Sequence, residues 1–216
     1  EATVKLRVGE DREFTVGGVE PRATVNWRVG EVKNELQAGV RFHIEYTEEQ
    51  RIDGEHSTSP TGVIRDDDER VGRALAAYAL NRVKLFDEKL EISPGLRFEG
   101  LWTERTIYRT RVEGVPTDLD PPRQDNNQIF ALIPGGGVSF NPVDLLTFFG
   151  GVHRGFAPPR TKDAISKEGQ KLELEAEYSW NYEVGARVMK DYWLRTELTG
   201  FILDFQNQII APAESG

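Results

Sequence analysis

Residues 36–47 alternate strictly between two kinds of side chain, and this alternation constrains the fold more than any other feature of the chain. The apolar positions are Leu36, Ala38, Val40, Phe42, Ile44 and Tyr46, and the polar or glycine positions are Gln37, Gly39, Arg41, His43, Glu45 and Thr47. Successive side chains of a β-strand point to opposite faces of the sheet, whereas a helix repeats every ~3.6 residues. The run therefore predicts a long strand with one apolar face and one polar face.

The same alternation recurs along the rest of the chain and predicts an all-β protein. It is clear in residues 22–29, 90–103 and 180–188. Read throughout, the pattern predicts eight strands, at about residues 14–29, 35–50, 70–86, 89–107, 127–140, 145–156, 178–189 and 193–210. Several of them exceed the usual strand length of about five or six residues.

The connections between these strands alternate in length. Residues 30–34, 87–88, 141–144 and 190–192 are short polar turns, whereas residues 51–69, 108–126 and 157–177 are predicted to form long loops. In an antiparallel up-and-down sheet, every second connection lies at the same rim. All the short turns would then share one rim and all the long loops the other, which is the asymmetry of outer-membrane β-barrels.

Strand length and aromatic placement favour a membrane barrel over a soluble sandwich, which would also alternate. A tilted strand crosses a bilayer in ~9–11 residues, and most of the predicted strands are at least that long. The longest apolar run, residues 74–80, is far short of the ~20 residues of a membrane helix. Interfacial girdles need aromatic residues near strand ends, and such residues occur here as Trp27, Tyr46, Trp102, Trp180, Tyr192 and Trp193.

The sequence does not decide whether the sheet closes into a barrel, because the partners of the first and last predicted strands are unknown. They must pair with each other, closing a barrel of eight strands, or with strands that lie elsewhere. Because residues 213–216 look like part of a loop rather than a terminal aromatic strand, we expect a segment of a larger barrel. Two alternatives remain: a self-contained eight-stranded outer-membrane barrel with an adhesin or structural role, and a soluble antiparallel β binding domain.

Two pairs of sequence elements resemble the barrels of TonB-dependent outer-membrane receptors of the ferric dicitrate, or siderophore, type. The first pair is Gly-Val-Glu-Pro-Arg at residues 18–22, followed by Gly-Val-Arg-Phe-His-Ile-Glu at 39–45. The second is Gly-Val-His-Arg-Gly-Phe-Ala-Pro-Pro at 151–159, followed by Asn-Tyr-Glu-Val-Gly-Ala-Arg at 181–187. The resemblance extends over residues 14–210.

This resemblance implies a transport receptor rather than an enzyme. Such receptors have a barrel of about 22 strands closed by a plug domain, and they take up ferric chelates or other small nutrients with energy relayed by TonB. Residues 1–216 would be a partial barrel domain, with the plug domain absent. The implied partners are outer-membrane lipid, the ferric chelate, the plug and the TonB complex, and the implied location is the outer membrane of a Gram-negative cell.

Five charged residues are predicted to line the lumen of the barrel, facing ligand or plug: Arg41, Arg97, Arg154, Glu183 and Arg187. Arg154 and Glu183 fall on neighbouring strands, so we predict an ion pair between them that could also contact the plug. The guanidinium groups of Arg41, Arg97 and Arg187 suit the carboxylates of an anionic chelate. The alternative is that all five are part of a hydrated wall.

Other functional classes find no support in the sequence. A net charge of -9 and a pI near 5.0, without a Lys/Arg-rich block, disfavour nucleic acid as a partner. The chain has no Cys, so His43-Ile44-Glu45 lacks the cysteines of a zinc deaminase. The acidic run 66–69 lacks the spacing of a calcium loop, and Gly135–Gly137 lack the Lys of a phosphate loop. We predict no catalytic residues, no metal site and no cofactor.

Overall fold

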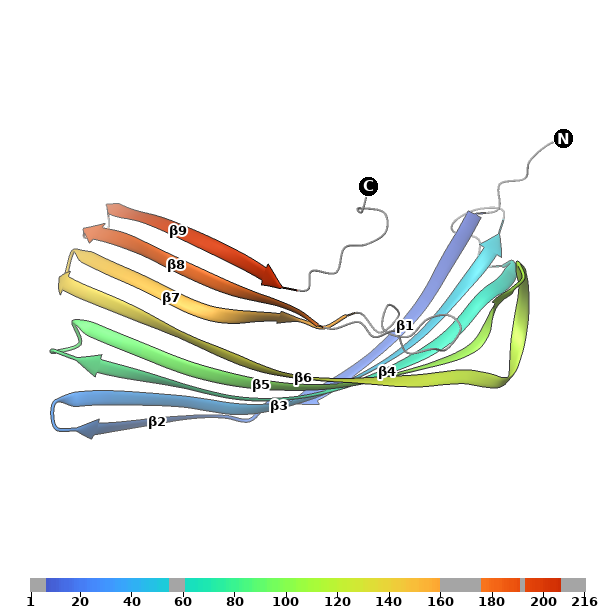
Figure 1. The fold of residues 1–216 in the computed structure, drawn as a ribbon, viewed down its shortest axis with the longest axis horizontal. Coiled ribbons are helices and arrows are strands. Elements are labelled where there is room, and N and C mark those ends of the chain that lie inside the picture. The colour runs from blue at the N-terminus through green and yellow to red at the C-terminus, as the bar shows by residue number, and fades with distance from the viewer. Residues whose placement is uncertain (1–6, 55–60, 160–175, 191–192, 207–216) are drawn as a thin grey trace.

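The computed structural model describes residues 7–54, 61–159, 176–190 and 193–206, which form one antiparallel β-sheet (Figure 1). Its strands are β1 (Arg7–Val19), β2 (Arg22–Val29), β3 (Val32–Gly54), β4 (Val63–Leu85), β5 (Leu90–Val112), β6 (Val115–Val143), β7 (Leu146–Ala157), β8 (Glu177–Lys190) and β9 (Leu194–Gln206). In this part of the chain no helix is long and apolar enough to cross a bilayer. The predicted all-β antiparallel fold is confirmed.

The strands follow one another in an up-and-down order from β3 to β9. Both β1 and β2 pair with β3, so they act as two halves of one long strand that is interrupted at Glu20–Pro21. Pro21 has no N–H to donate to the ladder, and the chain bridges the interruption with a hydrogen bond from the Val40 N–H to the Pro21 carbonyl, 3.2 Å. The eight strands expected from the sequence are therefore all present, with the first one broken in two.

The rim at which the long loops were predicted differs from expectation. Strands β5 and β6 continue through residues 108–126 and meet at a tight turn, in which Glu113 and Gly114 have φ angles of 52° and 86°. Strands β3 and β4 likewise take up most of residues 51–69. Most of the predicted loop 157–177 lies outside the described residues. The first two predicted loops are thus largely strand. The prediction missed them because their residues lack the apolar alternation that marks a strand.

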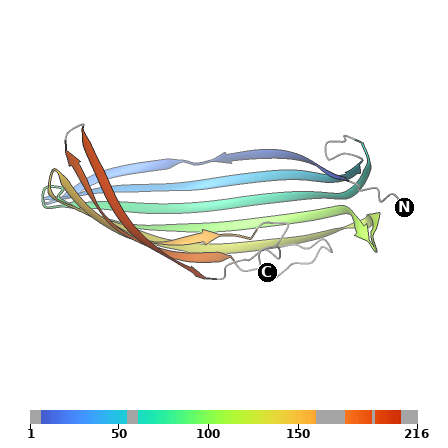
Figure 2. The ribbon, with the colours of Figure 1, turned by 90° about the horizontal axis from the view of Figure 1, so that it is seen from above.

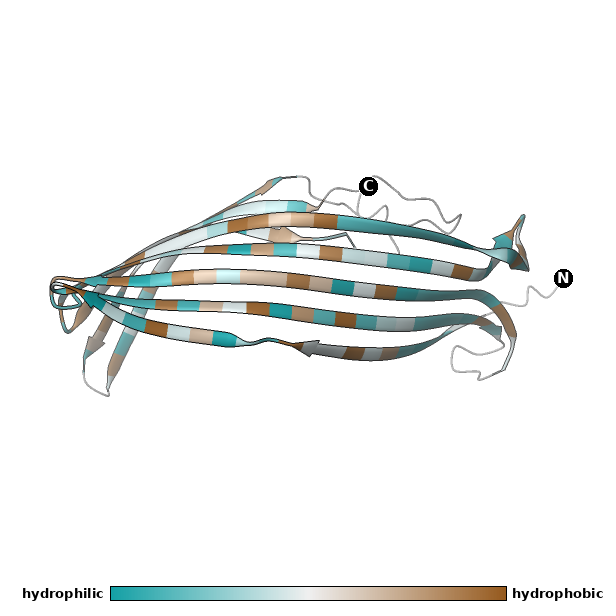
Figure 3. Ribbon diagram, turned by 90° about the horizontal axis from the view of Figure 1, so that it is seen from below, coloured by the Kyte–Doolittle hydropathy of each residue, from teal (hydrophilic) through white to brown (hydrophobic). Residues whose placement is uncertain are grey.

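The sheet has one apolar face and one polar face, which we define by the cross-strand register. The apolar face carries the row Val40, Ala77, Phe98 and Leu132, and farther along the row Gly136, Val152, Tyr182 and Ile202. Figure 3 shows the resulting alternation of hydrophobic and hydrophilic residues along each strand. The exposed fractions of Val40, Phe42, Tyr182 and Val184 are 46%, 45%, 45% and 67%, so no second layer of the described chain covers this face.

The polar face is the side on which side chains are buried. Its buried members include Thr47, Glu49, Ala76, Asp68, Arg105, Ile107, Asn127 and Ala131. The sheet is strongly curved (Figures 1 and 2), and in a single curved layer side chains crowd together on the inner side. We therefore identify the polar face as the inner, lumen-side face.

The edges of the sheet decide between the topologies left open by the sequence. Strands β1 and β2 lie at one edge and β9 at the other, and the described residues contain no pairing between the two edges. The sheet is thus an open wall rather than a closed eight-stranded barrel. The second packed sheet that a sandwich requires is likewise missing from the described part of the chain.

Candidate functional site

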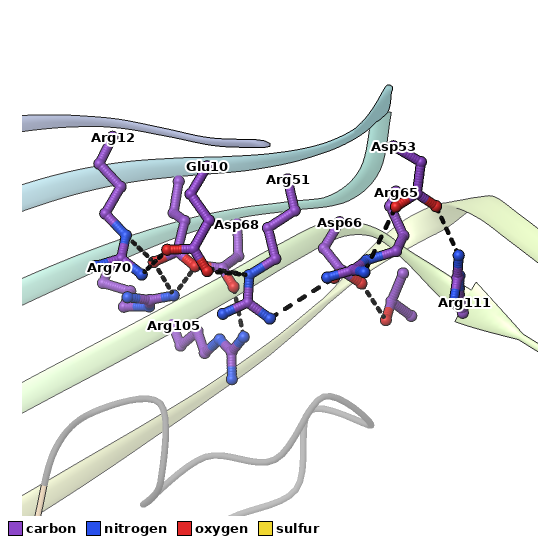
Figure 4. Close-up of polar contacts among 12 residues, drawn as sticks. Glu10, Arg12, Arg51, Asp53, Arg65, Asp66, Asp68, Arg70, Arg105 and Arg111 are labelled. Atoms are coloured by element: carbon purple, nitrogen blue, oxygen red, sulfur yellow. Dashed lines mark hydrogen bonds and ion pairs between the residues drawn. The ribbon is translucent and has the colours of Figure 1, made fainter. Parts of the chain in front are cut away.

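Arginine and carboxylate side chains from β1, β3, β4 and β5 form a continuous network on the loop-side half of the polar face (Figure 4). At its centre lies Glu49, whose side chain is only 3% exposed. Arg12 Nε reaches a Glu49 oxygen at 2.9 Å from β1, and an Arg70 nitrogen reaches the same oxygen at 3.0 Å from β4. One carboxylate of β3 therefore ties together three neighbouring strands.

A second buried carboxylate extends the network to β5. An Arg70 nitrogen lies 2.7 Å from an oxygen of Asp68 of β4 in an ion pair, and Arg105 of β5 binds the other Asp68 oxygen. The exposed fraction is 5% for both Asp68 and Arg105. Charges buried in this way are stable only when they are paired and hydrogen-bonded. The network thus fixes the side chains of β4 and β5 against each other.

Toward the loop rim the network continues in more exposed contacts. Arg51 Nε lies 3.2 Å from Glu10 and 3.2 Å from Glu49. Arg65 lies 3.0 Å from Asp66, and Arg111 lies 2.6 Å from Asp53. We define the arginine–carboxylate network by these contacts as Glu10, Arg12, Glu49, Arg51, Asp53, Arg65, Asp66, Asp68, Arg70, Arg105 and Arg111. With six arginines against five carboxylates, it carries a small positive excess.

Two pKa shifts in this region reflect its electrostatics, and both groups lie well beyond the ~9–11 residues of a membrane-spanning stretch. Burial opposes ionisation of Glu49, but Arg70, Arg12 and Arg51 outweigh it and hold the pKa of Glu49 below its ordinary value. On the other face, burial raises the pKa of Asp67; the hydrogen bond from Gln50 opposes this rise, and the neighbouring Asp68 and Glu69 add to it. At this level the polar face therefore stabilises the ionised form of Glu49, whereas the opposite face destabilises the ionised form of Asp67.

A hollow of about 500 Å³ lies beside the network on the polar face. Its charged and titratable lining residues are Arg12, Arg70, Arg73, His43 and Glu45, and Phe14, Leu101 and Ile129 supply apolar surface. Pro158 and Pro159, which follow β7, also line the hollow. It therefore offers cationic and apolar surface to the same occupant. Among the described residues, no three His, Asp or Glu side chains are grouped as metal ligands.

Four of the five predicted lumen residues share the polar face. Arg97 and Glu183 line one hollow of about 640 Å³, which Arg154 also borders, whereas Arg41 and Arg187 are not among its lining residues. Arg41 lies opposite Ala76, and Glu183 lies opposite Gly151. Arg97 Nε donates to Glu99 at 2.6 Å, and Arg187 Nε donates to Glu197 at 2.7 Å. Contact of these four residues with ligand or plug stays a prediction.

The predicted ion pair between Arg154 and Glu183 is wrong. Arg154 lies opposite Trp180, whereas Glu183 lies opposite Gly151, three positions earlier in β7. An odd offset along a strand reverses the face, so Arg154 is on the apolar face with Val152. Its guanidinium carbon lies 4.0 Å from the centre of the Tyr178 ring. The prediction placed Arg154 on the polar face by parity, but Arg154 has the parity of Val152, which the pairing with Gly136 and Tyr182 puts on the apolar face.

The sequence analysis missed the arginine–carboxylate network. Its members fall before the first predicted strand, at the ends of later ones, or inside the predicted loops 51–69 and 108–126. The sequence carries no period-two signal here, because residues 65–70 are all charged and Glu48 and Glu49 are adjacent.

Comparison with known proteins identifies the class. The family described as TonB dependent receptor-like, beta-barrel, matches residues 5–215. The chain therefore belongs to the TonB-dependent receptor β-barrel family. This confirms the resemblance at the level of the TonB-dependent receptor family, and not the ferric dicitrate, or siderophore, type.

Solved structures agree with this fold. The ferric citrate transporter FecA in its unliganded form matches with a TM-score of 0.76 and 20% identity over 95% of this chain. The ferric yersiniabactin uptake receptor FyuA from Yersinia pestis matches with a TM-score of 0.64 and 17% identity over 90% of this chain. The copper transporter OprC matches with a TM-score of 0.60 and 13% identity over 91% of this chain. This chain spans 30%, 29% and 31% of those three chains, respectively. At these identities the likeness shows the fold and leaves the transported solute open.

Proposed function

We propose that this chain is part of the barrel wall of an outer-membrane receptor for TonB-dependent uptake of a ferric chelate, such as ferric dicitrate or another siderophore. The remaining strands, the plug domain and the contact with TonB would come from the rest of the receptor. Transport by such a wall is binding and gating, without covalent chemistry. One observation carries the proposal: a sheet with an uncovered apolar face has a cationic hollow on its opposite face.

The apolar face supports the membrane location. Val40, Phe42 and Val184 are about half exposed or more, and they belong to a surface that runs across most of the sheet. Contiguous exposed apolar surface of this extent is rare on a soluble protein and marks contact with a membrane or with another protein. Hydrocarbon contact on one face and water on the other is the arrangement of outer-membrane barrels. The proposed location is therefore the outer membrane of a Gram-negative cell.

The hollow beside the network supports an anionic chelate as cargo. Arg12 and Arg70 face it, and guanidinium groups bind carboxylates in a planar, two-pronged geometry. Phe14, Leu101 and Ile129 add apolar surface for the organic part of a chelate. Neighbouring arginines of the network that do not line the hollow, such as Arg105, add to the positive electrostatic potential in it. Arg41, Arg97 and Arg187, lower on the same face, are proposed to contact the plug or the moving ligand.

Uptake assays in cells test this proposal. The full receptor would be expressed in a strain that lacks its own siderophore receptors, and uptake of radiolabelled iron would be followed for ferric citrate and a panel of ferric siderophores. We expect saturable uptake of at least one anionic chelate that disappears when TonB is deleted. Arg70→Gln should raise the concentration needed for half-maximal uptake about tenfold, since a hydrogen bond to a charged group contributes about 1.5–3 kcal/mol.

A matched control separates charge from position. Arg82 lies on the polar face near the short-turn rim and pairs with Glu35 at 3.4 Å, far from the hollow. Arg82→Gln removes the same charge and should leave the concentration dependence unchanged. Uptake that persists without TonB, or equal effects of the two substitutions, would contradict the proposal.

A further inference from the structure

A groove of about 630 Å³ crosses the apolar face over β5, β6, β7 and β8. Two glycines, Gly136 of β6 and Gly150 of β7, point toward this face by alternation and leave it hollow. Its walls include Ile92, Pro94, Pro134, Val138, Val152 and Trp180. A groove with such apolar walls on the membrane-facing side suits a hydrocarbon chain.

Arg154 lies at the loop-side end of this groove, directly opposite Trp180. It is the ninth residue of β7 counted from Leu146, and a tilted strand crosses the hydrocarbon layer in ~9–11 residues. Arg154 therefore lies at the outer boundary of the hydrocarbon, where lipid headgroups begin. Its neighbours Tyr178 and Trp180 are the aromatic residues typical of that boundary.

The guanidinium group of Arg154 has unused hydrogen-bonding capacity. Its hydrogen bond to the Leu132 carbonyl is long, at 3.4 Å. Its Nε is buried and has no acceptor among the described residues, and no described carboxylate forms an ion pair with it. Stacking on the Tyr178 ring fixes the plane of the guanidinium group. A cation on a lipid-facing surface is unfavourable unless an anion accompanies it.

We propose that Arg154 and the adjoining groove form a binding seat for a phosphorylated lipid of the outer leaflet. The headgroup phosphate would accept hydrogen bonds from the guanidinium group, as anionic headgroups do at basic sites on membrane proteins. One acyl chain would lie along Pro134, Val138 and Val152. The inference rests on the proposed membrane location, because a lipid seat has no function on a soluble protein.

A similar placement of arginine recurs on the same face. Arg73 of β4 lies opposite Trp102 of β5 and opposite Ile44 of β3. Arg73 is exposed, and within the described residues it forms no ion pair. Trp102 packs edge-on against Phe130, with ring centroids 5.6 Å apart. Both outward arginines that we identify are thus set against a tryptophan, but the groove adjoins only the Arg154 pair.

Native mass spectrometry of the full receptor in detergent micelles tests the seat. The probes are bis-phosphorylated lipid A and the same lipid after enzymatic removal of both phosphates. We expect the wild-type receptor to retain the phosphorylated lipid about tenfold more tightly. Arg154→Gln should abolish this difference, and Arg154→Lys should restore part of it. Arg82→Gln, a charge-matched control on the polar face, should change nothing.

A second variant tests the groove independently of the charge. A Cβ at Gly136 would lie 3.4 Å from the Ser93 carbonyl oxygen and 3.5 Å from Pro94 Cα, so the backbone has room for a side chain. Gly136→Leu should fill the groove and lower the retention of both lipids. Gly17→Leu is the control, because its Cβ meets only Ile44 Cγ2, at 3.8 Å, away from the groove.

The outcomes separate this inference from the proposed function. Equal retention of the two lipids by the wild-type receptor, or full retention of the phosphorylated lipid by Arg154→Gln, would overturn the lipid seat while leaving TonB-dependent uptake intact. Competition by inorganic phosphate alone would also overturn it, because the site would then recognise a free anion. A receptor found outside the membrane fraction would overturn both the lipid seat and the proposed function.

Discussion

Asp68 of β4 and Arg105 of β5 form an ion pair on the inner face of the sheet, with only 5% of each residue exposed. Breaking such a pair leaves one charge buried without its partner. Arg70 also binds Asp68, at 2.7 Å, so the loss of Arg105 is partly compensated. We therefore expect Arg105→Met to lower the free energy of unfolding by about 2 kcal/mol.

The double variant Asp68→Asn, Arg105→Met should be more stable than the sum of the two single changes predicts, because both charges are removed together. Urea titration of the refolded full receptor, followed by tryptophan fluorescence, measures these differences. Strictly additive effects would mean that the two side chains do not interact.

The lowered pKa of Glu49 makes stability depend on pH in one direction. Arg70, Arg12 and Arg51 outweigh the effect of burial, so the folded chain holds the ionised form more strongly than the unfolded chain does. This contribution is fully present above the ordinary pKa near 4.5, and it is lost as pH falls through the lower folded value. Glu49→Gln should therefore destabilise the receptor at pH 7, and progressively less as the pH falls below 4.5.

Unfolding midpoints of wild type and Glu49→Gln at several pH values test this dependence. We expect the two curves to converge as the solution becomes acidic. A constant difference from pH 7 to pH 3 would show that Glu49 contributes through packing rather than through its charge.

Gly39 of β3 lies beneath the ring of Tyr78 on the polar face. A Cβ at Gly39 would come within 2.7 Å of Tyr78 Cε1 and 2.7 Å of its hydroxyl oxygen. The same ring has the Arg97 guanidinium carbon 5.8 Å from its centre. Gly39→Val should force the ring aside and lower the free energy of unfolding by about 1–3 kcal/mol.

The ring itself can be removed to check the cause. In a Tyr78→Ala background the added side chain has room, so Gly39→Val should then cost less than about 1 kcal/mol. Heat-dependent mobility of the folded barrel on gels reports both variants. An equal cost in the two backgrounds would point to backbone strain in β3 instead of the ring.

The sequence could predict the strands that have one apolar and one polar face. The alternation at Val40, Phe42 and Ile44 marks such a strand, and these three side chains are exposed. The continuation of β5 and β6 through residues 108–126 has no apolar alternation and left no such signal. Strand existence was thus predictable, and strand length was not.

The candidate site depended on register, which a single sequence does not specify. Bulges between Arg51 and Ile52, and between Asp67 and Asp68, shift the partners in the network. The contacts of Glu49 with Arg12 and Arg70 lie in the regular part of the register, but they require the pairing of β1, β3 and β4, which the alternation alone does not give. Arg154 was misplaced for a related reason, because the parity count along residues 145–156 was assigned to the wrong face.

The two-faced wall can be tested directly by placing single spin labels on adjacent residues. The chain contains no cysteine, so Val184→Cys and Glu183→Cys give unique labelling sites in this segment. In lipid vesicles, we predict that the label at 184 is relaxed mainly by oxygen, which concentrates in hydrocarbon. The label at 183 should be relaxed mainly by a water-soluble nickel chelate. Equal accessibility of both labels to the nickel chelate would contradict the account of this chain as a membrane barrel wall.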